Sequence, residues 1–168
     1  GAEKQPGAIR TSQNWIGGSR PGNARFVPPP HDAVPEALAD LERWVHGDDP
    51  LPPLVRAGLA HVQFETIHPF LDGNGRIGRL LIVLLVEHWG ILKTPLLYLS
   101  LAFKRHRADY YQHLLEVRTK GDWEGWTAFY LRCVRESADD GVSAAKRLFD
   151  LLGRDRRAVA QHKATTVP

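Results

Sequence analysis

The sequence predicts an all-α domain with one small β-hairpin near its N-terminus. Apolar residues recur at helical spacing through most of residues 36–153. Residues 1–35 are instead rich in Gly, Pro and small polar residues, and no strand–helix–strand unit follows them. The chain has 168 residues, enough for one domain with a core of its own. We therefore expect a single domain over residues 1–168, with a hairpin region at 1–35, a helical core at 36–153 and a basic, fraying tail at 154–168.

The hairpin is expected from two short strand-like pieces, "NWIGG" and "ARFVPPP", on either side of the turn-forming "SRPGN". Pro28, Pro29 and Pro30 have no backbone N–H to donate to a ladder, so the second strand should lie at an edge.

The helical core begins with "VPEALADLERWVHG", where Leu38, Leu41 and Trp44 share one face. The pattern recurs in "LPPLVRAGLAHVQFETIHPF" and should stop before Pro69. The next segment, "GRIGRLLIVLLVEHWG", is apolar nearly all round, which predicts a buried central helix that ends at Gly90. Two or more further helices are expected between residues 100 and 153.

Composition excludes few classes of function. A hydrophobic fraction of 43% and a net charge of +3 are ordinary for a soluble domain, and the charge suits an anionic small molecule as well as nucleic acid. The basic tail has no helix-turn-helix or aromatic-interleaved pattern beside it, so nucleic-acid binding is not expected. The longest apolar run, 80–86, is far shorter than the roughly 20 residues that span a bilayer. Cys133 alone cannot form an intrachain disulfide, and no signal peptide opens the chain, which favours a cytoplasmic protein without membrane partners.

The stretch "TIHPFLDGNGRIGR", residues 66–79, concentrates the chemistry of the chain. Its glycines fit the G-x-G-x-x-G dinucleotide pattern, but that fingerprint needs a preceding strand, and the preceding segment here has a helical pattern. A metal-hydrolase site is a second alternative, because His61, Glu65, His68 and Asp72 recur at roughly one helical face. Pro69 should break the helix before Asp72, so we favour a polar patch that braces the helix end for His61 and Glu65.

A third interpretation lets the residues cooperate. Gly73, Asn74 and Gly75 come directly before a helix, and backbone N–H groups of a Gly-rich turn at a helix N-terminus bind anions. Arg76 and Arg79 are three residues apart, so both can reach the same polyphosphate.

Gly73, Asn74 and Gly75 thus form a candidate anion cradle, and the residues just before it are candidates for a metal ligand and a general base. Asp72 is well placed to hold a Mg²⁺ that bridges phosphate oxygens. His68, pinned by Pro69, is a candidate general base with a pKa suited to neutral pH. Together these features predict a phosphoryl- or nucleotidyl-transfer site.

The segment "HPFLDGNGRIGR" resembles the signature of the Fic family, H-P-F-x-[D/E]-G-N-G-R-x-x-R, at every specified position. "QNWIGG", "ARFVPPP", "LAHVQFETIHPF" and "PLLYLS" also resemble segments of the large bacterial Fic group, so the similarity covers roughly residues 10–152. It implies a Fic-type helical bundle whose hairpin, or flap, holds a segment of the target protein as an added strand.

The resemblance also implies an activity, the transfer of AMP from ATP to a hydroxyl of a target protein. His68 would deprotonate that hydroxyl, Asp72 would hold Mg²⁺, and Phe70 would anchor the loop. The nucleotide would be bound by a larger set: Gly73, Asn74, Gly75, Arg76, Gly78 and Arg79 at the phosphates, and Tyr110 and Tyr111 at the base.

Two further expectations concern other activities and regulation. A module that binds nucleotide or peptide with little turnover, or that carries out de-AMPylation or another phosphoryl transfer, is the alternative to an AMP transferase. Many Fic enzymes carry an inhibitory helix with the pattern [S/T]-x-x-x-E-[G/N], and no Ser or Thr of this sequence has Glu four residues later. The resemblance therefore places self-inhibition outside this chain, in an upstream segment or an antitoxin-like partner.

Overall fold

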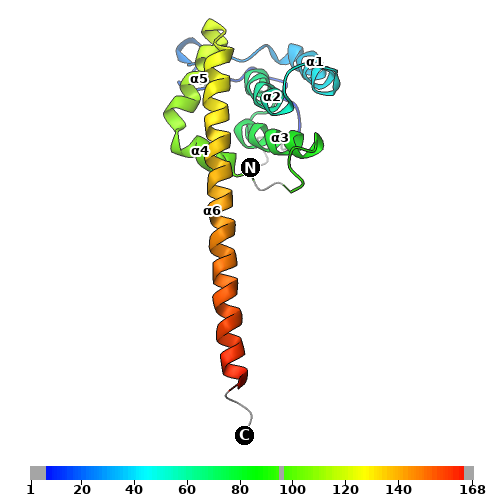
Figure 1. Cartoon of the computed structure of the whole chain (residues 1–168). Helices are drawn as coiled ribbons and strands as arrows, with labels where there is room; N and C mark the ends of the chain where they lie inside the picture. The colour runs from blue at the N-terminus through cyan, green and yellow to red at the C-terminus, as the bar shows by residue number, and fades with distance from the viewer. Residues whose placement is uncertain (1–6, 95–96, 165–168) are drawn as a thin grey trace.

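The computed structural model describes residues 7–94 and 97–164, with side chains up to residue 161. The six α-helices of this part of the chain confirm the predicted helical class. They are α1 (Val34–His46), α2 (Pro53–Ile67), α3 (Asn74–His88), α4 (Leu99–Arg105), α5 (Arg107–Lys120) and α6 (Trp123–Ala164). Two short 3₁₀ turns, Pro21–Asn23 and His31–Ala33, precede them. Figure 1 shows a compact bundle at one end of the molecule, from which α6 extends.

The centre of the bundle is α2, which is buried around most of its circumference. It packs against α1, α3 and the first half of α6. Gly58 brings α2 close to α6, because a Cβ at that position would lie 2.6 Å from the ring of Tyr130. Trp126 of α6 donates from Nε1 to the carbonyl of Gly58 at 3.0 Å. Helix α2, which ends at His68 of the motif, is thus held by three other helices.

The prediction that α3 is the buried central helix is wrong. Leu80 and Leu84 of α3 are 54% and 51% exposed, and Ile77 is also exposed. Only the face that carries Gly78, Ile82, Leu85 and Val86 is buried. Both faces of α3 are apolar in sequence, so the sequence did not show which face packs against α2. No element of the described residues covers the face opposite α2.

The N-terminal hairpin is reduced to a single antiparallel bridge between Ile16 and Phe26. Ile16 donates to the carbonyl of Phe26 at 2.9 Å, and Arg25 donates to that of Ile16 at 2.9 Å. Gly17 and Gly18 have φ of 71°, and prolines follow Phe26 within two residues, so neither side continues as a ladder within residues 7–94. The two segments still lie side by side as predicted, and we keep the name flap for residues 14–27.

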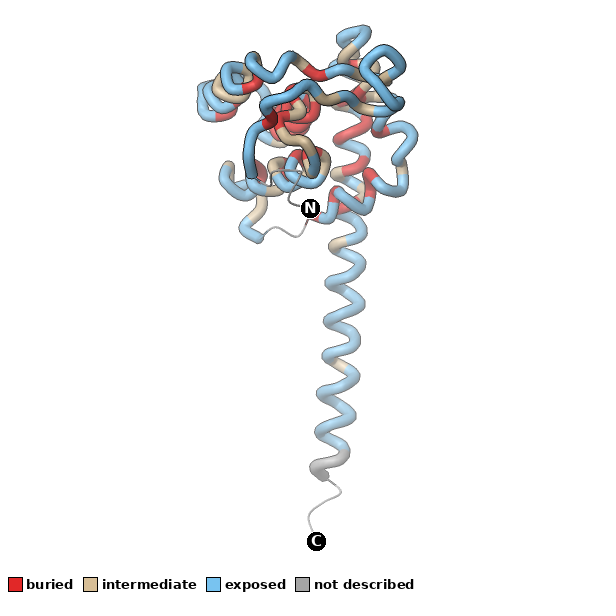
Figure 2. The backbone as a smooth tube through the Cα atoms, turned by 180° about the vertical axis from the view of Figure 1, so that it is seen from behind, coloured by how far each residue is buried: buried red, intermediate tan, exposed pale blue. Residues whose placement is uncertain are grey.

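Helix α6 is much longer than the sequence indicated. Residues 154–164, which we assigned to a basic, fraying tail, continue α6 as an exposed helix, and residues 165–168 lie outside the described part. The first half of α6 is buried against the bundle and contains the buried, unpaired Cys133, whose pKa burial raises to about 11. The second half, from about residue 142, extends from the bundle with almost all of its residues exposed (Figures 1 and 2). Among the described helices, α6 included, none is both long and apolar enough to cross a membrane.

We expect the two halves of α6 to differ in hydrogen exchange. Amides of residues 145–161 should exchange much faster than those of 126–137, because a helix without tertiary packing is marginally stable in water. Peptide-resolved exchange followed by mass spectrometry measures this, with the buried half of the same helix as the internal control. Equal protection of both halves would contradict the exposed arm seen in Figure 2.

Candidate active site

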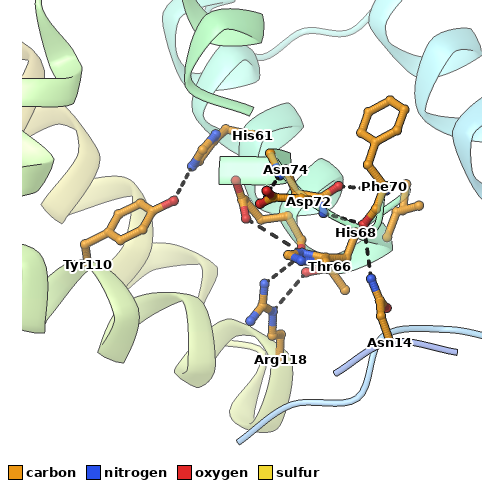
Figure 3. A network of polar contacts seen from close by, with 12 residues as sticks. Asn14, His61, Thr66, His68, Phe70, Asp72, Asn74, Tyr110 and Arg118 are labelled. Carbon is orange, nitrogen blue, oxygen red and sulfur yellow. Dashed lines mark hydrogen bonds and ion pairs between the residues drawn. The ribbon is translucent and has the colours of Figure 1, made fainter. Parts of the chain in front are cut away.

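The α2–α3 connection carries the motif and turns sharply at His68. This residue follows α2 in the left-handed conformation, with φ of 50° and ψ of 60°, and is the only described non-Gly residue with positive φ. Such a conformation is uncommon for a residue with a Cβ and is retained where the surrounding structure enforces it. Pro69 prevents α2 from continuing, so the imidazole stands at the end of α2 beside the start of α3 (Figure 3).

The His68 imidazole is oriented as a base. Its Nδ1 lies 3.3 Å from the backbone carbonyl of Glu65. A carbonyl oxygen can only accept, so Nδ1 carries the proton and Nε2 is left with a free lone pair. Burial lowers the pKa of His68 to about 4, and the nearby Arg118 and Arg10 act in the same direction. The ring is therefore neutral at pH 7, as a general base must be, but its pKa is well below the near-neutral value that we expected from the sequence, because that expectation took no account of burial.

Asn74 fixes the loop instead of facing a ligand. Its side chain is 2% exposed, accepts from the backbone N–H of Phe70 at 2.9 Å and donates to the Phe70 carbonyl at 2.7 Å. The Phe70 ring packs on Phe64 at 6.3 Å between centroids, consistent with the anchor that the sequence indicated. We expected Asn74 to bind phosphate, but its side chain does not face a phosphate site, because the amide oxygen and the amide nitrogen both bond to the backbone of Phe70. Its backbone N–H, in the first turn of α3, stays a candidate.

The anion cradle has the predicted geometry. Gly73 caps α3 with φ of 89°, a conformation that favours glycine, and accepts from the backbone N–H groups of Arg76 and Ile77. The N–H groups of Asn74 and Gly75 open the helix, where no carbonyl of the preceding turn is in position to accept them. The Arg76 side chain is exposed, and Arg79 is half-buried on the same side of the helix. The helix dipole adds to their positive charge.

Asp72 fits a magnesium ligand in its chemistry and position. It precedes the cradle, its side chain is about half exposed, and its Oδ2 lies 3.8 Å from the guanidinium of Arg76. Its Oδ1 accepts from the backbone N–H of Gly73 at 2.7 Å. This bond orients the carboxylate, and carboxylate oxygens are ligands that a hard cation such as Mg²⁺ prefers. Asp72 is not part of the one described group of three side chains with ligand spacing, His113, Glu116 and Asp122.

Gly78 serves packing rather than phosphate binding. It is buried, and a Cβ at this position would lie 2.6 Å from Oε1 of Glu65 and 3.1 Å from Nδ1 of His61. The glycine therefore lets α3 approach the polar side chains of α2. This corrects the expectation that Gly78 binds phosphate, because its open side faces the interior of the protein.

His61 and Glu65 form the buried polar patch that we favoured over a metal site. His61 is fully buried, and its Nε2 lies 2.9 Å from the hydroxyl of Tyr110 (Figure 3). Burial lowers the pKa of His61 to about 4 and raises that of Glu65 to about 7. The nearby arginines Arg118 and Arg79 oppose the shift of Glu65.

Two arginines that sequence reasoning missed hold the loop in place. Arg10 is 1% exposed and donates from Nε to the carbonyl of His68 at 3.0 Å, with further bonds to the carbonyls of Ser12 and Pro29. Arg118 of α5 donates to the carbonyl of Glu65 at 2.8 Å. Apart from the Thr66 hydroxyl, to which Arg118 also donates, their partners are backbone carbonyls, which no side-chain pattern reveals.

Arg118 also connects the site to the flap, because its guanidinium lies over the Phe26 ring at 4.1 Å. The flap and α5 enclose a cavity of about 690 Å³ lined by Arg118, Phe26, Tyr111 and Arg107, among others. Tyr111 is exposed at this cavity and stays a candidate for the nucleotide base. Tyr110 is 4% exposed and bonded to His61, so its expected place at the base is corrected to the core.

Comparison with known proteins agrees with this architecture. The sequence profile of the Fic/DOC family matches residues 2–86, half of the chain. The chain belongs to the Fic/DOC family. It is 32% identical over 148 residues to protein adenylyltransferase fic-1 of Caenorhabditis elegans, covering 87% of this chain and 26% of that protein. It is 29% identical to protein adenylyltransferase Fic of Drosophila melanogaster, covering 79% of this chain and 25% of the fly protein. The chain thus spans about a quarter of the length of these relatives.

Solved structures show the same fold. A Fic family protein from Desulfovibrio desulfuricans superposes with a TM-score of 0.70 at 31% identity, over 82% of this chain and 41% of that one. A fragment of C. elegans Fic-1 superposes with a TM-score of 0.60 at 29% identity, over 83% of this chain and 38% of the other. The similarity extends to both bacterial and animal proteins.

Proposed function

We propose that this domain transfers AMP from ATP to a hydroxyl side chain (Tyr, Ser or Thr) of a target protein. The observation that carries the proposal is the position of His68, whose Nδ1 faces the carbonyl of Glu65 and whose ring stands beside an anion cradle and two arginines. A module that only bound nucleotide would have no use for a base held in a strained backbone conformation. Two relatives of similar sequence are named protein adenylyltransferases, which supports the same reaction.

The residues divide the reaction between them. Nε2 of His68 accepts the proton of the target hydroxyl as its oxygen forms a bond to the α-phosphorus of ATP. The bond between that phosphorus and the bridging oxygen to the β-phosphate breaks, and pyrophosphate leaves with the electron pair. The N–H groups of Asn74 and Gly75 would bind the phosphates, and Arg76 and Arg79 would stabilise the charge on the departing group. Mg²⁺ held by Asp72 would supply further neutralisation of that charge.

Two cavities are candidates for the two ends of the nucleotide. A cavity of about 220 Å³ beside Arg76 and Arg79, bounded by Tyr98 and Ser100, would take the β- and γ-phosphates. The larger cavity beneath the flap, beside Tyr111, would take the base and ribose. The target segment would lie along the flap as an added strand, beside the bridge between Ile16 and Phe26. An inhibitory helix, from an upstream segment or a partner, would act by pairing a glutamate with Arg79.

The proposal is tested by incubating the protein with ATP labelled in the adenosine moiety, Mg²⁺ and a cell lysate. Covalent label on defined hydroxyl side chains, identified by mass spectrometry, is expected. Binding of ATP without any covalent transfer, to lysate proteins or to the chain itself, would favour the binding module instead.

We expect replacement of Asp72 by Asn to raise the Mg²⁺ concentration needed for half-maximal transfer by about 10-fold or more, because a metal ligand loses its charge. ATP affinity without metal should not change. Transfer assays over a range of Mg²⁺ concentrations measure the first effect, and calorimetric titration of ATP without Mg²⁺ measures the second. The matched control is Asp48→Asn, which changes an exposed aspartate outside the motif. Equal Mg²⁺ dependence in wild type and Asp72→Asn would remove Asp72 from the metal site.

A further inference from the structure

Glu65 is a buried carboxyl group that the proposed reaction does not use. It is 5% exposed and lies one turn before His68 on α2. Its Oε1 is fully buried and has no hydrogen-bond partner among the described residues. A buried carboxyl oxygen left without a partner is unfavourable, and in a native protein it calls for an explanation.

The orientation of the carboxyl shows what it faces. Oε1 lies 2.6 Å from the position that a Cβ of Gly78 would take and 3.7 Å from that of Gly75, so it points at the first two turns of α3. Nη1 of Arg79 lies 3.2 Å from the same Gly75 position. The carboxyl and the guanidinium therefore approach one helix turn from neighbouring sides. The other oxygen, Oε2, lies 4.0 Å from Nδ1 of His68.

Electrostatics connects the same groups. The charge of Arg79 acts on Glu65 and lowers its pKa, against the larger effect of burial, and Arg118 acts likewise. A carboxylate is the natural partner for a guanidinium that must point in one direction, because it accepts N–H bonds in a fixed planar geometry. The family signature leaves the position of Gly78 unspecified, yet this chain places there a residue without a side chain, which makes room for the carboxyl.

We infer that Glu65 is a positioning residue whose charge, and not a direct hydrogen bond, orients the guanidinium of Arg79 over the first turn of α3, at the phosphate end of the site. The inference rests on the proposed function, in which Arg79 contacts the β- and γ-phosphates. Glu65 itself touches no substrate. It acts through Arg79, from the side of α3 that packs against α2.

A double-mutant cycle tests the coupling. Glu65→Gln keeps the shape of the side chain and removes its charge, and it should lower kcat/KM for ATP by roughly 10- to 100-fold, because the buried charge that attracts Arg79 is lost. In an Arg79→Ala background the same change should cost less than about 3-fold, because the group it positions is absent. Ser137→Ala is the matched control. It also removes a buried side-chain oxygen that has no hydrogen-bond partner among the described residues, but it lies in α6 and should leave activity unchanged. A full loss from Glu65→Gln in both backgrounds, or no loss in either, would overturn the inference.

Two further measurements keep the test decisive. If Glu65→Gln does not fold, the carboxyl ¹³C resonance of Glu65 can be titrated in wild type and Arg79→Ala. Its pKa should be higher in the variant, and an unchanged value would overturn the inference. ATP affinity measured by calorimetry separates this inference from the proposed function. A wild type that binds ATP without transferring AMP contradicts the proposed reaction, whereas the Glu65–Arg79 coupling is still measured in the binding cycle.

Discussion

Replacement of His68 by Asn should lower AMP transfer by about 10²–10⁴-fold while ATP binding is retained, because the imidazole acts on the incoming hydroxyl and not on the phosphates. Asn is preferred to Ala for this test, since residue 68 has φ of 50°, a conformation that Asn tolerates well. Transfer is measured with labelled ATP and binding by calorimetry, with His31→Ala, an exposed histidine, as the control. Loss of ATP binding together with transfer would give His68 a structural role instead.

The pH dependence of the wild type provides a second check on the same residue. Burial lowers the pKa of His68 from its ordinary 6.5 to about 4, so its base form persists as the pH falls. Glu65 also titrates in this range, because burial raises its pKa to about 7, so the wild type should lose activity as the pH falls through 7 and Glu65 becomes neutral. In Glu65→Gln, where that carboxyl is absent, the remaining rate should stay constant from pH 7 to about 5 and decline only as the pH approaches 4. An acid limb centred near pH 6.5 in kcat/KM of Glu65→Gln would show that the imidazole titrates as an ordinary histidine, contrary to its buried environment.

Replacement of Gly78 by Val should destabilise the fold by about 1–3 kcal/mol and disrupt the site, because the new side chain enters space that is already filled. A Cβ there would lie 2.6 Å from Oε1 of Glu65 and 3.1 Å from Nδ1 of His61, both on the central helix α2. Part of the cost is that α3 must move away from α2, and α3 carries the phosphate cradle. Chemical denaturation measures the change in free energy of unfolding.

Gly22→Val is the matched control for this substitution. Gly22 is exposed, and a Cβ there would meet no atom within 4 Å, so its replacement should change stability by about 0.5 kcal/mol or less. Similar losses for the two variants would mean that the close approach of α2 and α3 at Gly78 contributes little.

The residues that we propose to act on substrate could be singled out from the sequence, because the chemistry expected of them is local. His68, Asp72, Gly73 and the two arginines lie within twelve positions, and the structure brings them to the junction of α2 and α3 as their spacing indicated. Asn74 and Gly78 share the same motif but serve the fold. A motif records that a residue type is required, and only the contacts distinguish an amide that binds phosphate from one that binds the backbone of Phe70.

The features that sequence could not predict depend on contacts between distant segments. Arg10 binds a carbonyl 58 residues away, and Arg118 binds one 53 residues away, with no periodic or local pattern to mark either. The choice between α2 and α3 as the central helix failed for a similar reason. Both segments are apolar, and burial was decided by how α1 and α6 pack around α2. The length of α6 was missed because its second half has no core to define it.

The position of the label on ATP tests the central claim most directly. The protein is incubated with Mg²⁺, with an unlabelled target protein identified in the lysate experiment, and with ATP labelled either on the α-phosphate or on the γ-phosphate. Our account predicts that the α-label becomes covalently attached to the target, that the γ-label is released with pyrophosphate, and that His68→Asn abolishes attachment. Attachment of the γ-label, or attachment of the α-label at an undiminished rate in His68→Asn, would contradict an AMP transfer in which His68 is the base.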